Sequence, residues 1–147
     1  MWSIPGGDSN LDLLMGDYRL ALNVSEWRKE HPNKPYPEWA SLSKKYLHGA
    51  NLYEVDLHGA FLFEADLSEA DLFGADLHGA YLYRANLSGA DLREADLHEA
   101  DLYRANLRGA MLAGTNLIGV VLRDVDLEGA NLTDAILTYA DLKKRGK

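Results

Sequence analysis

Leucine recurs at every fifth position over a hundred residues of the chain, and this feature constrains the fold more than any other. From Leu42 to Leu142, all 21 positions of the series are leucine. The position two residues before each leucine is usually small, with alanine in 16 of the 21 cases. Glycine stands two residues after the leucine nine times. A repeat this regular has to be interpreted before any helix or strand is assigned.

A period of five fits neither an α-helix, which repeats about every 3.6 residues, nor a β-strand, which repeats about every two. On one helix the leucines would rotate by about 140° at each step, and no apolar face would form. The period is explained if each unit is a short extended side followed by a corner, because glycine is favoured where a turn needs a positive φ. Closing such sides into a coil directs each leucine, and the small residue before it, toward the coil axis. The predicted core consists of these leucines: Leu62, Leu67, Leu72, Leu77, Leu82, Leu87, Leu92, Leu97, Leu102 and Leu107.

The repeating unit resembles that of the pentapeptide-repeat family, Ala-(Asp/Asn)-Leu-X-X. Matching stretches include Ala65-Asp66-Leu67-Ser68-Glu69, Ala85-Asn86-Leu87-Ser88-Gly89 and Ala130-Asn131-Leu132-Thr133-Asp134. The resemblance covers residues 40–144 and implies an all-β fold, a right-handed quadrilateral β-helix with four repeats per coil. It therefore implies 20 residues per coil and about five coils. Stacked coils bury a continuous core that one coil alone cannot form.

We expect three segments: an N-terminal helical cap (residues 1–39), a pentapeptide-repeat β-solenoid (40–144) and a basic tail (145–147). In the first segment, Trp27 and Trp39 are expected to lie close to the first coil. The stretch from Trp27 to Pro32 is similar to a Trp-Arg…Pro segment that precedes the repeats in some bacterial family members. Two interpretations stay open, a module that recruits another protein and a cap that covers the unpaired backbone edge of the first coil. We favour the cap.

Two short helices are predicted within residues 1–39. The first begins with Ser9 or Asn10 as its N-cap and stops at Gly16. The second begins at about Asp17, or at Ser25, and ends at Pro32. After Leu142 we see no amphipathic helix, so the last coil is expected to be protected by its charges or paired with another molecule.

The charge distribution limits the kinds of partner. The chain has 23 acidic and 15 basic residues and a formal net charge of −8, and it has no cysteine, which excludes disulfides and thiolate metal sites. Between Tyr46 and Leu142 there are 17 acidic and five basic residues, so the predicted shaft is acidic and its ends are basic. This balance argues against direct nucleic-acid binding. Without an apolar stretch of about 20 residues or a signal peptide, we expect a cytoplasmic protein that does not bind membranes.

A coil of 20 residues places residues 20 apart above one another, which gathers aromatic side chains on one side. We call this set the aromatic face: Phe61, Phe63, Tyr81, Tyr83 and Tyr103, with Arg84 and Arg104 in the next column. An exposed aromatic patch usually marks an interaction surface. Two structural interpretations also stay open: residues 1–39 cover these rings, or the rings simply stack between coils and stabilise the shaft.

A second column contains His58, His78 and His98, beside Asp56, Asp76 and Asp96. Imidazole is a common metal ligand. However, three coplanar side chains about 5 Å apart converge poorly on one tetrahedral ion. We therefore predict no specific metal site here and no cofactor.

The sequence contains no convergent catalytic set. Its carboxylates lie on a regular outer wall rather than in an apolar pocket, its glycines form no phosphate-binding loop, and the packed leucines leave no lumen. We expect a non-enzymatic protein-binding scaffold, whose partner is another protein or a second copy bound through the aromatic face or the C-terminal coil. Since some family members, including quinolone-resistance proteins, mimic DNA and bind type II topoisomerases, a DNA-mimicking modulator is the alternative. A structural spacer without a specific ligand is a third hypothesis.

Overall fold

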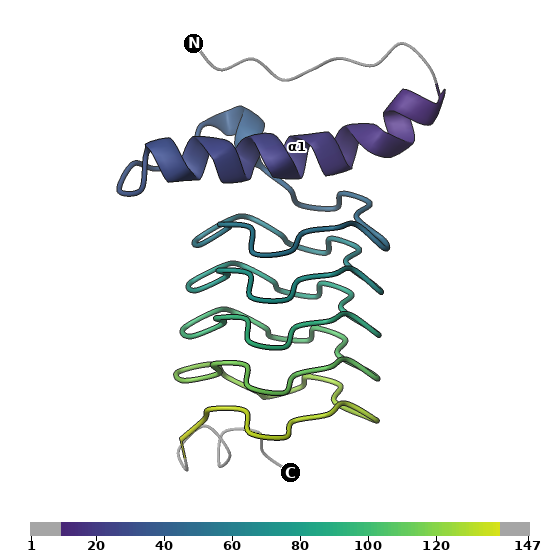
Figure 1. Ribbon diagram of the computed structural model, residues 1–147, viewed down its shortest axis with the longest axis vertical. Helices are drawn as coiled ribbons and strands as arrows, with labels where there is room; N and C mark the ends of the chain where they lie inside the picture. Colours follow the sequence, from purple (N-terminus) through teal and green to yellow (C-terminus); the bar gives the residue numbers. More distant parts are fainter. Residues whose placement is uncertain (1–9, 139–147) are drawn as a thin grey trace.

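The computed structural model describes residues 10–138 (Figure 1). The chain begins with one long helix, α1 (Asn10–Glu30), followed by a short 3-10 helix, η1 (Glu38–Ala40). It then winds into coils that stack along the long axis of the molecule, and α1 lies across their N-terminal end (Figure 1). Within residues 10–138, no helix combines the length and the apolar character that a membrane span requires. The predicted Ser9 cap, the repeats after residue 138 and the basic tail lie outside the described residues.

Each coil takes 20 residues. Parallel bridges join Tyr46 to Asp66, Phe61 to Tyr81 and Asp66 to Asn86, and every other bridge in residues 10–138 has the same separation of 20. The bridging residue is always the one before an inward leucine. These bridges are isolated because a corner follows every five residues, which leaves one paired position on each of the four sides.

Backbone hydrogen bonds run along the shaft and across each corner. The Leu62 amide donates to the Tyr81 carbonyl of the next coil (2.9 Å), and the Tyr81 amide donates back to the Ala60 carbonyl (2.9 Å). At the corner, the Ala65 amide donates to the Leu62 carbonyl (3.1 Å). From Leu42 to Leu132, the second residue after each leucine takes a left-handed conformation, with φ of 66° at Gly59 and 59° at Glu94. The corner therefore explains why glycine recurs at this phase of the repeat.

The core is the column of leucines and alanines on the coil axis. Each leucine of the series from Leu42 to Leu122 is at most 2% exposed, and the ten leucines named as the predicted core are among them. Thr115 stands at a position that is usually alanine, and its buried hydroxyl donates to the Leu92 carbonyl (2.7 Å). Burial continues into α1 through Leu20, Ala21 and Val24, which belong to the same apolar cluster.

The prediction of two short helices was wrong, because α1 runs without interruption through Gly16 and Asp17. Gly16 is not in the left-handed conformation that a glycine helix stop requires. Ser25 lies inside the helix and does not start one. The predicted end was nearly right, since α1 ends at Glu30, two residues before Pro32.

Two side chains of α1 contact the backbone edge of the first coil. The Tyr46 amide donates to Asp17 Oδ2 (2.7 Å), and the Asp56 amide donates to Ser25 Oγ (3.0 Å). One coil further along the shaft, the corresponding amide of Asp66 donates to a backbone carbonyl, that of Lys45. Helix side chains thus take the place of the missing coil at two positions.

Candidate interaction surface

The rings of the aromatic face lie on one side of the shaft, at the positions directly before and directly after the inward leucines. Phe61, Phe63 and Tyr81 keep 36%, 38% and 43% of their surface exposed. Tyr83 and Tyr103 are half-buried. The register of 20 places all five rings on the N-terminal part of one side, as predicted, in two groups of contacting rings.

The rings stack along the shaft axis. Phe61 and Tyr81 have centroids 5.3 Å apart with planes 20° from parallel, and Phe63 lies 6.0 Å from Tyr81. Tyr83 and Tyr103 form a second stack at 5.6 Å and 28°. Because stacked rings cover one another's faces, this surface offers mainly ring edges and tyrosine hydroxyls to a partner.

The two arginines of the aromatic face lie beside its tyrosines. The Arg84 guanidinium is 6.0 Å from the Tyr83 ring centroid, and its Nη1 is 3.7 Å from Glu64 Oε1. The Arg104 guanidinium lies 5.2 Å from the Tyr103 centroid. Each exposed contact of this kind contributes about 0.5–1 kcal/mol. These contacts therefore fix the positions of the arginine side chains and add little to the free energy of unfolding of the shaft.

The N-terminal segment reaches the aromatic face at its edge. Tyr36 meets Phe61 edge-on, with centroids 6.2 Å apart, and its hydroxyl donates to the His58 carbonyl (2.8 Å). Burial raises the pKa of Tyr36. Since Phe63 and Tyr81 remain more than one third exposed, this contact leaves most of the aromatic face open.

Trp27 and Arg28 are buried, with 8% and 5% of their surface exposed. The Arg28 guanidinium lies 3.8 Å from the Tyr36 ring centroid. Its Nη1 donates to three carbonyls after α1, those of His31 (3.1 Å), Pro32 (2.9 Å) and Lys34 (3.0 Å). Trp39 is half-buried and packs against the core. The Arg28 contacts fasten the end of α1 to the segment that follows it, and the burial of Trp27 and Arg28 leaves little of the pair for a partner.

A second aromatic column, which the sequence reasoning missed, lies on the opposite side of the shaft. Tyr53 and Phe73 stack at 5.5 Å with planes 6° apart, and the Arg93 guanidinium lies 5.5 Å from the Phe73 centroid. The hydrogen bond from Arg93 lowers the pKa of Asp91. The spacing of 20 between Tyr53, Phe73 and Arg93 was the signal that would have found this column.

The three histidines form a regular ladder. The rings of His58 and His78 lie 4.7 Å apart, those of His78 and His98 lie 4.8 Å apart, and their planes differ by 4° and 5°. Each Nδ1 is 2.6 Å from the Oδ1 of the aspartate two residues earlier. In addition, His58 Nε2 is 3.2 Å from the Pro32 carbonyl. The aspartates therefore fix the orientation of all three rings.

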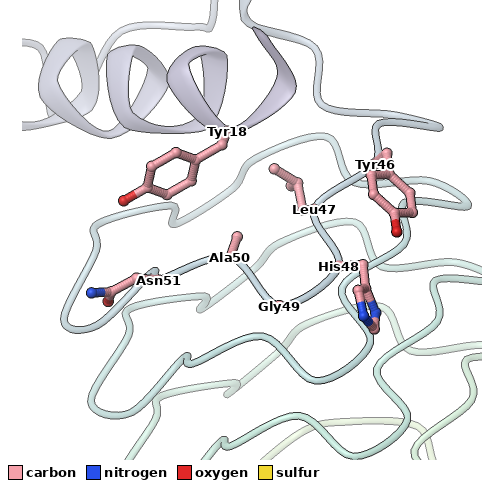
Figure 2. Close-up of a pocket in the computed structure, with 7 residues that line it drawn as sticks. All are labelled: Tyr18, Tyr46, Leu47, His48, Gly49, Ala50 and Asn51. Atoms are coloured by element: carbon pink, nitrogen blue, oxygen red, sulfur yellow. The ribbon is translucent and has the colours of Figure 1, made fainter. Parts of the chain in front are cut away.

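A pocket of about 300 Å³ lies between α1 and the first coil (Figure 2). Its lining residues are Tyr18, Tyr46, Leu47, His48, Gly49, Ala50 and Asn51. His48 Nδ1 is 2.8 Å from Ser68 Oγ, whose hydroxyl donates to Asp66 Oδ1 (2.5 Å). Because the hydrogen of the Ser68 hydroxyl is directed at Asp66, His48 Nδ1 acts as a donor to the serine oxygen and does not remove the serine proton. The three residues therefore do not form a nucleophile and its general base.

The repeat that carries these aromatic side chains and histidines also occurs in other proteins. No curated protein matches this chain. Among solved structures, a pentapeptide repeat protein from Nostoc Pcc 7120 is 36% identical over 65% of this chain and 81% of its own, with a TM-score of 0.46. One from the Arabidopsis thaliana thylakoid lumen is 31% identical over 73% of this chain and 77% of its own, with a TM-score of 0.44. QnrB1, a plasmid-mediated fluoroquinolone resistance protein, is 23% identical over 60% of this chain and 56% of its own, with a TM-score of 0.39.

The sequence model that describes pentapeptide repeats matches residues 38–69, 70–109 and 110–144. These ranges hold the leucine series and the coils that it builds. The chain belongs to the pentapeptide-repeat family.

Proposed function

We propose that this chain is a non-enzymatic binding protein and that its aromatic face contacts another protein. One observation carries the proposal: five aromatic rings gather on one side of a rigid shaft, and three of them stay more than one third exposed beside the N-terminal segment. Exposed aromatic clusters flanked by arginine are typical of the residues that dominate protein interfaces.

The ring geometry favours a protein over a sugar or a nucleobase. A sugar or base that stacks on an aromatic platform needs an open ring face. Here the faces of Phe61 and Tyr81, and of Tyr83 and Tyr103, are turned toward one another. Ring edges and hydroxyls instead suit apolar side chains, aromatic faces and carbonyl groups of a protein surface.

We further propose that residues 1–39 form the cap of the solenoid of residues 40–144. Since the chain belongs to the pentapeptide-repeat family, this solenoid is expected to be a right-handed β-helix. Asp17 and Ser25 accept hydrogen bonds from two edge amides of the first coil. The burial of Trp27 and Arg28 supports this role over a recruiting module. Covering an edge in this way prevents further strands from pairing with it.

The test is a pull-down from an extract of cells that express the chain, with variants on opposite sides of the shaft. Tyr83→Ala combined with Tyr103→Ala removes one stack from the aromatic face. Tyr53→Ala combined with Phe73→Ala is the matched control, since it removes a similar stack from the other side. We expect a specific partner to be lost from the first variant and kept by the second. Equal recovery by both variants would count against the aromatic face.

Light scattering distinguishes a second copy from a different protein. If the wild-type protein is a dimer and the Tyr83→Ala, Tyr103→Ala variant is a monomer, the partner is another copy of this chain. If both are monomers, the pull-down partner is a different protein.

The acidic surplus of the shaft favours one second candidate, a DNA-mimicking modulator of a type II topoisomerase. Between Tyr46 and Leu142 acidic residues outnumber basic ones by 17 to five. Part of this charge is paired, since Arg108 contacts both Asp126 and Glu128. A gyrase supercoiling assay tests the idea: inhibition or protection by stoichiometric amounts of the protein supports it, and unchanged supercoiling contradicts it.

A further inference from the structure

We propose that His78, Asp96 and His98 form a binding site for one divalent transition-metal ion of the kind that imidazole and carboxylate ligands favour, such as Zn²⁺. This inference does not depend on the aromatic face. It departs from the expectation drawn from the sequence, that the histidine column with the aspartates beside it converges poorly on one ion. The structure adds that one donor atom of Asp96 lies within 4.8 Å of donor atoms of both His78 and His98.

The donor atoms of the three residues lie close together. His98 Nδ1 is 2.6 Å from Asp96 Oδ1, and one donor atom from each of the three residues lies within 4.8 Å of the others. Two donors on one tetrahedral zinc ion are about 3.4 Å apart, given Zn–N distances of about 2.0–2.1 Å. Binding therefore requires the Asp96–His98 pair to open slightly and the two imidazoles to tilt toward each other. The tilt has to be substantial, because the two ring planes differ by only 5°, and the contact of His78 Nδ1 with Asp76 Oδ1 (2.6 Å) has to open if that nitrogen binds the ion. The side chains of His78, Asp96 and His98 are 35–39% exposed, so solvent borders part of each of them.

The chemistry of the donors selects the ion. Two imidazoles and one carboxylate suit zinc, nickel and copper, and they leave open positions for water. Calcium and magnesium prefer all-oxygen sites. The Asp96 carboxylate is the anionic ligand of this set.

A neighbouring triangle, His58, Asp76 and His78, is less suited to an ion. His58 has an acceptor at each ring nitrogen, Asp56 Oδ1 at 2.6 Å and the Pro32 carbonyl at 3.2 Å. Its side chain is only 20% exposed. Because the two triangles share His78, occupation of one prevents occupation of the other. We therefore expect one ion per chain, held between His78 and His98.

Isothermal titration of the untagged protein with ZnCl₂ at pH 7.5 tests the site. We expect saturable binding with a stoichiometry of one. His98→Asn and Asp96→Asn should each weaken the affinity by about tenfold or more, since each removes a ligand. Asp96→Asn is informative because the amide oxygen can still accept the hydrogen bond from His98 while the anionic ligand is lost. MgCl₂ in excess should not compete.

Two matched variants separate the site from other sources of binding. His58→Asn removes a histidine of the same ladder, and Asp66→Asn removes an acidic residue from another side of the shaft. Both should bind zinc as the wild type does, and circular dichroism melts establish that every variant is folded. The proposal is overturned if no saturable heat is seen, if His98→Asn binds as tightly as wild type, or if His58→Asn weakens binding as much as His98→Asn does.

Discussion

Replacing Ser25 by alanine tests how the helix α1 holds the first coil. Ser25 is 3% exposed, and its hydroxyl oxygen accepts the hydrogen bond from the Asp56 amide (3.0 Å). Alanine removes the acceptor and leaves the amide without a partner in a place that water reaches poorly. An unsatisfied buried polar group costs about 1–3 kcal/mol, so the free energy of unfolding should fall by about that amount. Asp17→Ala should cost less, because the exposed Tyr46 amide can bond to water instead.

Chemical denaturation gives the free energy of unfolding, and amide hydrogen exchange locates the effect. In Ser25→Ala the Asp56 amide should exchange faster than in wild type, while the Asp96 amide, which donates to the Ala75 carbonyl, should not change. Ser88→Ala, a serine on an outer side of the shaft, serves as the control and should leave stability within about 0.5 kcal/mol of wild type. Wild-type stability together with unchanged exchange of the Asp56 amide in Ser25→Ala would refute this reasoning.

Three further predictions concern the shaft. Leu92 is fully buried, so Leu92→Ala should lower the free energy of unfolding by about 3–5 kcal/mol, as measured by denaturant melts. Leu92→Asp should prevent folding, and a Leu92→Asp protein as stable as wild type would rule out inward leucines. Glu94→Gly should raise stability by about 0.5–1 kcal/mol, because Glu94 has a φ of 59° that glycine adopts without strain, and a lower melting temperature would contradict this. Because Arg93 lowers the folded pKa of Asp91, the stabilising effect of this pair should be complete above the unfolded pKa of 3.8 and disappear as the pH falls through the folded value. The stability difference between wild type and Arg93→Gln should therefore shrink in acid to what the contact of Arg93 with the Phe73 ring contributes, and a difference independent of pH would contradict the pairing.

Much of the shaft could be predicted from the sequence, because one period determines both which residues face inward and which stand above one another. The period of five placed Leu62 and Leu92 on the axis. The spacing of 20 paired Phe61 with Tyr81 and His78 with His98. The same arithmetic applied to Tyr53 would have found its stack on Phe73, so that column was missed although its signal was present.

The N-terminal segment could not be predicted in the same way, because its conformation depends on tertiary contacts. Gly16 normally favours a helix stop, but α1 continues past it, and Asp17 and Ser25 further along bind the edge amides of the first coil. Nothing local to Arg28 indicates that it will be buried over Tyr36 and bind three carbonyls. The Asp96–His98 contact likewise depends on the exact orientation of both side chains, which the spacing of residues in the sequence does not specify.

Site-specific photocrosslinking tests the central claim, that the aromatic face is the surface that binds a protein. Benzoylphenylalanine placed at Phe63 reports on the aromatic face, and the same group placed at Phe73 reports on the opposite side of the shaft. After irradiation in cells, we expect a discrete crosslinked species from position 63 and none from position 73. Crosslinks from position 73 alone, or the same products from both positions, would contradict the claim.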